Sequence, residues 1–489
     1  MKQSKSKKFY ITTTLPYVNA AAHMGHALEF VQADIIARYH KLLGEDVFLN
    51  TGTDEHGLKI YRRAVEENKD PKEYVDEYAE KFKQFCKALD MDYTAFIRTT
   101  DPHHISAAQE FWRLCDKKGD IYKGAYKVKY CVGCELEKTD SELVDGRCPL
   151  HPSLEIEIIE EENYFFRFSN YQKQLLELYD KDPGFVVPDS RMHEIRNFVA
   201  AGLQDFSISR LKSKMPWGIT VPGDDSQVMY VWFDALINYI STLGWPENID
   251  KFGEFWGDGG DRNAIQIAGK DNLRQQSAMW QAMLMSAGLP GSKIILIHGF
   301  ITGEGGLKMS KTLGNVVDPI GVINEFGTDA LRYWFAREMP TFEDGAFTLD
   351  KFRESYNANL ANGLGNLVSR VMKMAATHDV RLDMDMVKKN EAYRIEYNKH
   401  LEFFEIQKAA NLVWDLIKKS DSLIEINEPF KKIKIEEEKE NAKTTIKLLL
   451  ANLYEIGYLL RPLMPETSAK ITKAIEDNAE ITKPLFPRL

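Results

Sequence analysis

The hydrophobic pattern of the first 57 residues changes from strand-like to helical and back. Residues 9–18 (FYITTTLPYV) form an apolar run ended by Pro16, because proline is unfavourable inside a central strand, and this run predicts a short buried strand. Residues 26–43 predict a helix that ends before Gly44, at the usual place of a helix C-cap. Apolar side chains recur there at helical spacing: Leu28, Val31, Ile35, Tyr39 and Leu42. Residues 46–57 (DVFLNTGTDEHG) predict a second buried strand, so the three elements predict a βαβ unit.

The two strands of such a unit end at the same edge of their sheet, where open α/β proteins bind ligands. The residues that follow each strand should therefore lie near one another. These residues are Leu15, Tyr17, His23, His26 and Asp54.

The pattern changes twice more along the chain. After about residue 115 the sequence is rich in turns and cysteines, and strand-like material resumes at residues 227–241 (QVMYVWFDALINYIS). Residues 263–271 (NAIQIAGKD) predict a strand and a loop, residues 273–286 a helix, and residues 292–302 (SKIILIHGFIT) a further buried strand. We interpret this part as one α/β domain interrupted by an insertion. From about residue 350 the pattern is helical to the end, which predicts a helical bundle.

Composition limits the class of protein. The chain has 489 residues, 44% of them hydrophobic and 28% charged, which is typical of a soluble protein of two to four domains. It contains no apolar run of about 18 residues and no signal-peptide pattern, so we expect no membrane association. Five cysteines argue against a disulfide framework and for a reducing, cytoplasmic location. The net charge of −10 disfavours a nucleic-acid binder, unless a local basic face exists.

Four possible metal ligands stand in two close pairs, C-x-x-C and C-x-x-H. They are Cys131, Cys134, Cys148 and His151. Two tight turns joined by a loop suit a closed tetrahedral site, so the pattern favours structural Zn²⁺. The alternative, a redox-active C-x-x-C pair, leaves the second pair unexplained, and no helical pattern follows Cys134. Cys86 and Cys115 lie in helical patterns and are interpreted as packing residues.

Two further motifs are compatible with phosphate binding. His23 and His26 stand at a predicted helix start, where free N–H groups and the helix dipole attract anions, and Gly25 allows close approach of a ligand. Far downstream, Lys308 and Lys311 flank Ser310 and Met309 in a glycine-flanked loop. Taken alone, each motif is also explained without function, as a histidine pair at a helix start or as lysines on a surface loop.

Together the two motifs resemble the signature pair of class I aminoacyl-tRNA synthetases. Further segments resemble the methionyl-tRNA synthetase family in the same order: TLPYVNAAAHMGHA, TGTDEHG, YVWFDALINYIS, AGKD and FEDGAFT. The resemblance implies a Rossmann-type α/β catalytic domain with a zinc-bearing connective insertion, followed by an all-α anticodon-binding bundle. It implies these segments: residues 1–115 and 226–300 for the two catalytic halves, 116–225 for the insertion, 301–350 for the KMSKT loop and stem-contact region, and 351–489 for the anticodon-binding domain.

The resemblance implies activation of L-methionine with ATP, Mg²⁺ accompanying the ATP, and transfer of methionine to the 3′ end of tRNA(Met). Its catalytic residues would be His23, His26, Lys308 and Lys311. Its ATP site would add Gly25, Gly269, Asp271 and Ser310. Its methionine site would comprise Asp54 for the ammonium group and, around the side chain, Leu15, Tyr17, Trp232, Ala235, Tyr239, Gln276 and Trp280.

The resemblance implies that the anticodon is bound by Asn362, Asn366, Arg370 and Phe430. The first three are spaced i, i+4 and i+8, on one face of a predicted helix. The sequence departs from the family twice. Gln276 stands where many relatives have histidine, and Phe430 where they have tryptophan, so an aromatic face for base stacking remains. Without the resemblance, Trp232 and Tyr239 would be read as core residues, and the polar triplet as an exposed helix face.

Three alternatives remain open. A nucleotidyltransferase-type enzyme shares H-x-G-H but would lack the insertion and the helical third. A class I synthetase of another specificity is possible, although the leucine, isoleucine and valine enzymes usually carry a large editing insertion. A non-catalytic tRNA-binding protein is the third. Because the C-terminal dimerisation module of some relatives does not follow the helical region, we expect a monomer.

Overall fold

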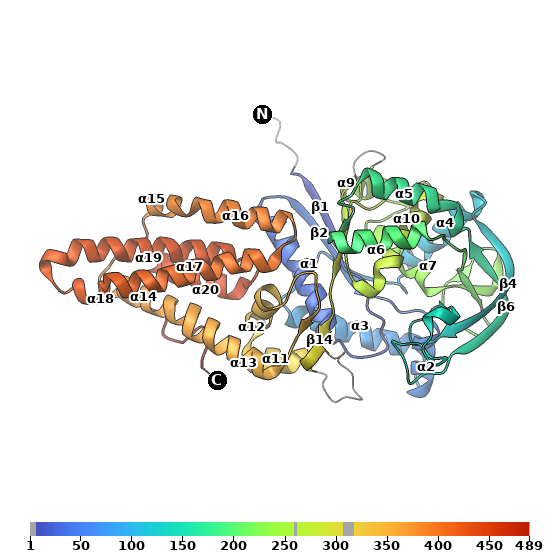
Figure 1. Cartoon of the computed structure of the whole chain (residues 1–489), viewed down its shortest axis with the longest axis horizontal. Helices are drawn as coiled ribbons and strands as arrows, with labels where there is room; N and C mark the ends of the chain where they lie inside the picture. Colours follow the sequence, from blue (N-terminus) through green and yellow to red (C-terminus); the bar gives the residue numbers. More distant parts are fainter. Residues whose placement is uncertain (1–5, 259–261, 307–316, 489) are drawn as a thin grey trace. The chain divides into compact units, whose positions relative to one another are not determined.

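A computed structural model describes residues 6–258, 262–306 and 317–488 of the chain (Figure 1). The chain divides into two compact units. The first unit comprises Met1–Ala22, Glu45–Lys87 and Asp92–His298. The second unit comprises His23–Gly44, Ala88–Met91 and Gly299–Leu489. Among the described residues, no helix is both long enough and apolar enough to cross a membrane.

A parallel sheet forms the centre of the first unit. Its order within the described residues is β3 (Ala95–Arg98), β2 (Asp46–Thr53), β1 (Lys8–Thr12), β12 (Ala264–Gly269), β13 (Ile294–His298) and β7 (Val186–Val187). Nearly every residue of β1, β2 and β12 is buried, as expected for the strands of a parallel sheet. The strands predicted near residues 9–18, 46–57, 263–271 and 292–302 are thus confirmed, with shorter bounds. Their carboxyl ends lead directly into the segments that carry the predicted site residues.

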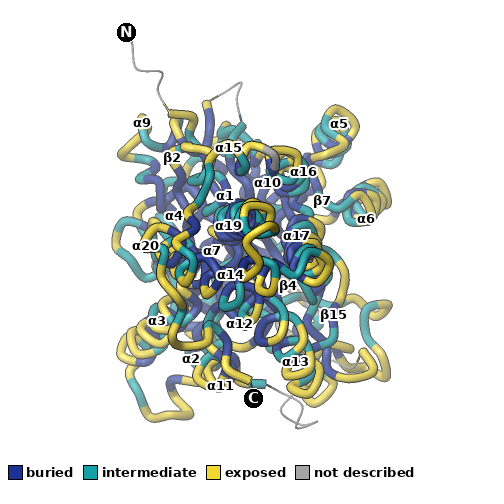
Figure 2. The backbone as a smooth tube through the Cα atoms, turned by 90° about the vertical axis from the view of Figure 1, so that its left-hand side faces the viewer, coloured by how far each residue is buried: buried dark blue, intermediate teal, exposed yellow. Residues whose placement is uncertain are grey.

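Helices and short antiparallel sheets complete the first unit. Its helices are α2 (Leu58–Glu66), α3 (Pro71–Ala88), α4 (Pro102–Lys117), α5 (Gln172–Lys181), α6 (Asp189–Ala200), α7 (Val231–Ala235), α8 (Asn238–Ser241), α9 (Ile249–Phe255) and α10 (Trp280–Ala287). Helices α5 and α6 expose much of their surface (Figure 2). The prediction of strand-like structure at residues 227–241 is wrong after Met229. Strand β11 (Asp224–Met229) ends there, and helices α7 and α8 follow. The prediction failed because this apolar run is buried on all sides, and hydrophobic periodicity cannot then distinguish a strand from a helix.

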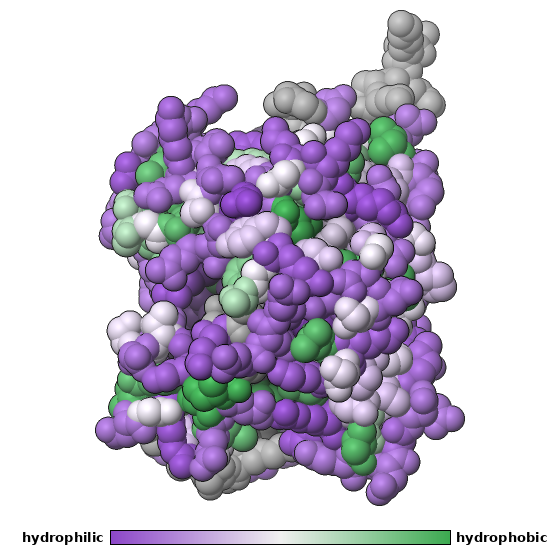
Figure 3. Space-filling view, turned by 90° about the vertical axis from the view of Figure 1, so that its right-hand side faces the viewer, coloured by the Kyte–Doolittle hydropathy of each residue, from purple (hydrophilic) through white to green (hydrophobic). Residues whose placement is uncertain are grey.

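The predicted insertion contains a long antiparallel hairpin. Strand β4 (Ile121–Cys131) pairs with β6 (Glu157–Phe166), flanked by β5 (Leu136–Lys138) and β8 (Phe206–Ser207). A second sheet contains β9 (Ser209–Leu211), β10 (Thr220–Val221) and β11. The surface over β4 and β6 is mostly hydrophilic, with separate apolar patches (Figure 3). The cysteine-rich turns lie between β4 and β6.

Buried aromatic side chains dominate the core of the first unit. Trp280 and Trp256 are fully buried, and Phe111 stacks on Trp280 with ring centroids 5.6 Å apart. Tyr239 meets the edge of Trp280 at 5.9 Å, and its backbone carbonyl accepts a hydrogen bond from the hydroxyl of Tyr10 on β1. Large rings in fixed geometry contribute both buried area and orientation. Two of the predicted site residues, Tyr239 and Trp280, are therefore held by the core itself.

The second unit is mostly helical. Its helices are α1 (Met24–Leu42), α11 (Pro319–Phe326), α12 (Thr328–Tyr333), α13 (Leu349–Ser355), α14 (Asn366–Thr377), α15 (Met384–Val387), α16 (Glu391–Glu402), α17 (Ile406–Asn427), α18 (Pro429–Lys432), α19 (Lys439–Leu460) and α20 (Pro465–Asp477). Strands β14 (Ile301–Thr302) and β15 (Gly345–Ala346) form a small parallel pair. Helix α19 packs against α14, α17 and α20, which confirms the predicted bundle. Residues 356–365 form a π-helix rather than a regular α-helix.

A buried ion pair holds helix α1 within the second unit. Arg332 on α12 and Asp34 on α1 lie 2.8 Å apart, and neither side chain is exposed. The same guanidinium donates to the backbone carbonyls of Leu89, Pro462 and Leu463. Burial of a charge is tolerated when it is both paired and fully hydrogen-bonded. Helix α1, which carries the predicted phosphate-binding histidines, is therefore fixed at its middle by this arginine.

Candidate functional site

The two signature histidines begin helix α1 as a reciprocal capping box. The ring Nδ1 of His23 accepts from the backbone N–H groups of Gly25 (3.1 Å) and His26 (3.4 Å), and Nδ1 of His26 accepts from the N–H of His23 (3.3 Å). The rings stack with centroids 3.7 Å apart. A Cβ added to Gly25 would lie 3.0 Å from the His23 ring, so glycine permits this close packing.

The capping box also sets where each ring carries its proton. A nitrogen that accepts from a backbone N–H has no proton of its own, so the neutral rings of His23 and His26 are protonated at Nε2. Burial and the neighbouring His23 hold the pKa of His26 well below its ordinary value of 6.5. His26 is therefore a neutral N–H donor at physiological pH, at a helix N-terminus where anions bind.

The other predicted ATP-site residues are only partly described. Lys308, Ser310 and Lys311 lie outside the described residues. Gly269 ends strand β12, and Asp271 lies in the following 3₁₀ turn. A Cβ on Gly269 would stand 2.8 Å from the carboxylate of Asp271, so this strand end accepts glycine alone without rearrangement.

Asp54 stands one residue beyond strand β2 and is almost completely buried. Its backbone forms a bridge with Tyr17: the N–H of Asp54 donates to the carbonyl of Pro16 (3.0 Å), and the N–H of Val18 donates to the carbonyl of Asp54 (3.2 Å). Burial, together with the negative charges of Asp234 and Glu135, raises the pKa of Asp54 well above its ordinary 3.8.

Several buried polar atoms around Asp54 have no hydrogen-bond partner among the described residues. They are Oδ1 of Asp54, the hydroxyl of Tyr17 and Nε1 of Trp232. Native proteins pair more than 90% of such atoms, so a group of orphans indicates a site for a ligand. The ring of Tyr17 meets that of Trp232 edge to face at 6.3 Å, and Leu15, two residues earlier in the chain, is half-buried. A carboxylate acceptor beside aromatic side chains suits a ligand that has both a cationic group and an apolar portion.

The remaining predicted methionine-site residues lie on two short helical segments. Trp232, Ala235 and Tyr239 follow one another at i, i+3 and i+7 along α7 and α8. Gln276 lies in a π-helical turn before α10, and its amide nitrogen donates to the Tyr239 hydroxyl at 2.6 Å. The structure thus joins Tyr17, Asp54 and Trp232 in one group, and Tyr239, Gln276 and Trp280 in another.

A buried network around Asp234 lies outside the set of predicted site residues. Asp234 is fully buried, and its carboxylate forms hydrogen bonds with Nδ1 of His56 at 2.7 Å and with Nε2 of His104 at 2.8 Å. Burial alone would raise the pKa of Asp234, but the two histidines lower it below its ordinary 3.8. A lone carboxylate within the apolar run VWFDALI was the signal for this residue. The network fixes the segment that carries Trp232 and Ala235.

The four predicted metal ligands converge. Their ligand atoms all lie within 4.8 Å of one another, and the three cysteines are free thiols. Sγ of Cys134 lies 3.5 Å from Sγ of Cys148 and 3.2 Å from Nδ1 of His151. In a tetrahedral zinc site, ligand atoms stand roughly 3.5–3.8 Å apart, so the spacing fits. A Cβ on Gly133 would lie 2.4 Å from the His151 ring, which makes glycine necessary for this geometry.

A buried carboxylate connects the turn that carries Cys134 to the chain beside Tyr17. Glu135, which directly follows Cys134 and adopts φ +53°, is buried and accepts from the backbone N–H of Lys59 at 2.8 Å. The ammonium of Lys59 donates to the carbonyl of Gly133 (3.1 Å) and lies 5.8 Å from the centre of the Tyr17 ring. Glu135 is not among the predicted site residues, and no motif in the sequence indicates it.

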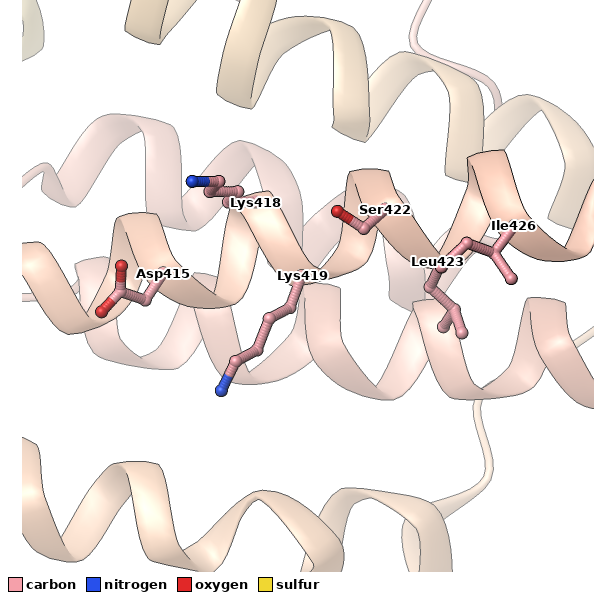
Figure 4. A pocket seen from close by; sticks show the side chains of 6 residues that line it. All are labelled: Asp415, Lys418, Lys419, Ser422, Leu423 and Ile426. Carbon is pink, nitrogen blue, oxygen red and sulfur yellow. The ribbon is translucent and has the colours of Figure 1, made fainter.

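The predicted RNA-reading residues are accessible. Asn362 and Asn366 are exposed, at the end of the π-helix and the start of α14, and Phe430 on α18 is 41% exposed. Arg370 is half-buried and lies 3.5 Å from Asp421 on α17. A groove along α17 contains none of these residues; Figure 4 shows its six lining side chains, which all come from that helix. They are Asp415, Lys418, Lys419, Ser422, Leu423 and Ile426.

Comparison with known proteins accounts for nearly the whole chain. The family model described as class I tRNA synthetases (M) matches residues 9–155 and 151–372, and that of the anticodon-binding domain of methionyl-tRNA ligase matches residues 375–484. A methionine–tRNA ligase of Caldanaerobacter subterraneus is 39% identical, over 97% of this chain and 75% of the relative. One from Nostoc sp. is 40% identical, over 95% and 89%.

Solved structures give the same result. Methionyl-tRNA synthetase of Mycobacterium tuberculosis in complex with methionyl-adenylate superimposes with a TM-score of 0.89 at 34% identity, over 95% of this chain and 93% of that one. A second structure of the same protein bound by methionyl-adenylate gives 0.90 at 33% identity, over 98% and 100%. The chain therefore belongs to the methionine–tRNA ligases, a family of class I tRNA synthetases.

Proposed function

We propose that this chain is a methionine–tRNA ligase in activity as well as in family: it activates L-methionine with ATP, releases pyrophosphate and transfers the methionyl group to the 3′ end of tRNA(Met). The observation that carries the proposal is the orphaned carboxylate oxygen of buried Asp54 within aromatic walls. An amino-acid ammonium would satisfy that oxygen, and an apolar side chain would fill the space beyond it.

In the first step the methionine carboxylate attacks the α-phosphorus of ATP and pyrophosphate leaves. The protein needs no covalent intermediate for this displacement, so positioning and electrostatic stabilisation carry the rate. We assign the phosphate contacts to Nε2–H of His23 and His26 and to the ammonium groups of Lys308 and Lys311. Gly25, Gly269, Asp271 and Ser310 complete the proposed ATP site. Mg²⁺ would accompany the ATP and neutralise phosphate charge.

For the amino acid, we assign the ammonium to Asp54 and the side chain to Leu15, Tyr17, Trp232, Ala235, Tyr239, Gln276 and Trp280. An apolar pocket discriminates by only about 1–3 kcal/mol per methylene, so specificity must also use polar groups beside the thioether. We propose the catalytic halves at residues 1–115 and 226–300, the insertion at 116–225, the loop and stem-contact region at 301–350 and the anticodon-binding domain at 351–489.

One assay tests this function: ATP–pyrophosphate exchange with each of the twenty amino acids. Exchange that depends on methionine alone is the expected result, followed by charging of tRNA(Met) but not of other tRNAs. Exchange with another amino acid would assign another class I specificity. Binding of tRNA without any exchange would leave a tRNA-binding protein.

We further propose that Cys131, Cys134, Cys148 and His151 hold structural Zn²⁺. The closely spaced thiols and imidazole and the need for glycine at position 133 support this assignment. When bound, the metal would fix the turns that position Glu135, and Glu135 in turn holds the chain at Lys59 beside Tyr17.

Gly133→Ala is expected to lower metal affinity about 10- to 100-fold, because the added methyl group displaces the His151 ring. The KM for methionine should rise about tenfold with it, while the KM for ATP changes little. Metal content per chain and exchange kinetics measure the two effects. Gly124→Ala on β4 is the matched control, since its methyl group would meet its nearest neighbour at an ordinary 3.5 Å. Full metal content in Gly133→Ala would contradict the assignment.

For RNA recognition, we assign the anticodon to Asn362, Asn366, Arg370 and Phe430. The exposure of Asn362, Asn366 and Phe430 supports this assignment, and Phe430 lies within the family's anticodon-binding domain at residues 375–484. The acidic net charge is acceptable because recognition needs only a local face. Arg370→Ala is expected to reduce kcat/KM for charging of tRNA(Met) about 10- to 100-fold and to leave methionine-dependent exchange unchanged, because guanidinium contacts to bases contribute about 1–3 kcal/mol. Lys419→Ala in the α17 groove is the matched control. Unchanged charging by Arg370→Ala would remove the assignment.

A further inference from the structure

Asp54, Glu55 and His56 follow strand β2 in a row, and their side chains point to two different sides. The carboxylate of Glu55 is completely buried and accepts hydrogen bonds from Arg98 on β3 at 2.6 and 2.9 Å. His56 points instead to α7, where its Nδ1 lies 2.7 Å from the carboxylate of Asp234. Side chains alternate along an extended chain, and the negative charge of Asp234 also acts on Asp54. Asp54 and His56 therefore share the side of the chain that faces α7.

The carboxylate of Asp234 determines where its two histidine partners carry a proton. Burial alone would raise the pKa of Asp234, but the histidines lower it below the ordinary 3.8, so the group is ionised and only accepts hydrogen bonds. Nδ1 of His56 and Nε2 of His104 are therefore the protonated nitrogens. The second nitrogen of the neutral His104 ring accepts from the hydroxyl of Ser241 at 2.9 Å. The second nitrogen of the neutral His56 ring, Nε2, is likewise an acceptor.

Nε2 of His56 is an acceptor that has no donor. Among the described residues, only Nδ1 of this ring has a hydrogen-bond partner, and the residue is 5% exposed. Trp217 packs against the ring with centroids 5.7 Å apart, and its Nε1 donates to the backbone carbonyl of Glu55 at 2.6 Å. The ring is thus fixed by Asp234 and Trp217, while Nε2 stays available. Oδ1 of Asp54, on the same side of the chain, is also without a donor.

Two acceptors without donors, two residues apart, suit a ligand that has at least two donors, because buried acceptors in native proteins are nearly always paired. A primary ammonium has three N–H bonds, so it can donate to a carboxylate oxygen and to an imidazole nitrogen together. A hydroxyl group has one donor and cannot serve both. A neutral imidazole is also a suitable second acceptor here, because the negative charges of Asp234 and Glu135 already act on Asp54.

We propose that Nε2 of His56 is a second acceptor for the α-ammonium group of the substrate, beside Oδ1 of Asp54, so that the site selects for a primary amine. Asp234 and His104 are positioning residues: they hold the His56 ring and its tautomer and do not touch the substrate. This role rests on the proposed methionine site and adds a neutral partner to Asp54 there. The buried network around Asp234 thereby becomes part of amino-acid recognition.

The test compares methionine with its 2-hydroxy analogue, in which a hydroxyl group replaces the ammonium. His56→Asn keeps an N–H where Nδ1 donates to Asp234 but has no acceptor at the position of Nε2. It should raise KM for methionine about 10- to 100-fold in ATP–pyrophosphate exchange, because a hydrogen bond to a charged group is lost. The analogue has only one donor, so its inhibition constant against methionine should rise less than about threefold.

His56→Gln makes the opposite change. Its amide oxygen can replace Nε2 as the acceptor, while the bond from Nδ1 to Asp234 is lost. KM for methionine should therefore stay closer to that of the unaltered protein in His56→Gln than in His56→Asn. The reverse order, or an equal loss of methionine and analogue binding in His56→Asn, would assign His56 to the fold alone and overturn the proposal.

Two variants of His104 test the positioning role. Glutamine can place an N–H where Nε2 donates to Asp234, whereas asparagine is too short. KM for methionine should rise about threefold in His104→Asn and recover in His104→Gln, with KM for ATP little changed, because one hydrogen bond behind the site is lost and restored.

His103→Asn is the matched control. His103 is the neighbour of His104 on α4, and its Nε2 bonds to the backbone carbonyl of Ser241 and not to Asp234. This variant should leave KM for methionine unchanged. An unchanged KM for methionine in His56→Asn would overturn the proposed second acceptor, whereas absence of methionine exchange in the unaltered protein would overturn the proposed function instead.

Discussion

Asp54→Asn is expected to lower kcat/KM for methionine about 100- to 1000-fold, equivalent to roughly 3–4 kcal/mol. The substitution keeps the shape of the side chain but removes the negative charge that we assign to the substrate ammonium. Because Asp54 is 3% exposed, water cannot replace the lost interaction. Exchange kinetics at varied methionine and fixed ATP measure the effect, which should fall on KM for methionine and not on KM for ATP.

The stability of the free protein separates this effect from misfolding. Burial raises the pKa of Asp54 above its unfolded value of 3.8, so the folded chain binds that proton more tightly. Its stabilising contribution is fully present below pH 3.8 and is lost as the pH rises through the raised pKa. Above the raised pKa, the ionised group is therefore unfavourable without its ligand. Asp54→Asn should leave the free energy of unfolding unchanged or increase it, as thermal unfolding would show.

The pH dependence of methionine binding follows from the same shift. An ammonium prefers the carboxylate, so methionine affinity should rise as the pH increases through the raised pKa of Asp54 and then level off. Asp54→Asn has no such titration and should show no rise in that range. A variant that binds methionine as tightly as the unaltered protein would remove Asp54 from the site.

His26→Ala is expected to lower ATP–pyrophosphate exchange about 100- to 1000-fold with methionine affinity nearly intact, because one donor to the transition-state phosphates is lost. The same loss is expected for Lys311→Ala. Both effects belong to kcat or to KM for ATP. Near-normal exchange in either variant would contradict its assigned role.

The capping geometry allows a sharper pair of variants at His26. Asparagine can place an oxygen where Nδ1 accepts from the N–H of His23, but it has no donor at the position of Nε2. Glutamine places an N–H near Nε2 and loses the cap. If phosphate binding is the function of His26, His26→Gln should retain more exchange than His26→Asn. The reverse order would assign the residue to helix capping alone.

Acid should affect His26 in a defined direction. Its pKa is held well below 6.5 by burial, so as the pH falls past 6.5 the unfolded chain takes up a proton that the folded chain does not. The free energy of unfolding therefore decreases as the pH falls below 6.5, while His26 in the folded chain keeps its neutral Nε2–H donor. The proposed phosphate contact therefore needs no charge on the ring.

The sequence predicted best where a local pattern had one structural solution. Strands β1, β2, β12 and β13 lie where apolar runs predicted them, and four ligands in two tight pairs converge as metal ligands should. The sequence predicted less well where a segment is buried on all sides, because hydrophobic and polar residues then show no periodic pattern. Residues 231–241 are helical although they read as strand, and residues 356–365 form a π-helix that helical spacing could not distinguish from an α-helix.

By itself, the sequence predicted the main parallel strands, the helical C-terminal bundle, the four candidate metal ligands and, through the motifs that resemble it, the family. Only the tertiary structure decided that Asp54 keeps an orphaned oxygen and that Glu135 connects the turn of Cys134 to Lys59. It also decided that α7 and α4 place Asp234 between His56 and His104. The reason is physical. Hydrophobic period and ligand spacing depend on neighbours along the chain, whereas the desolvation of a carboxylate and the direction of a hydrogen bond depend on atoms that folding brings together from distant segments.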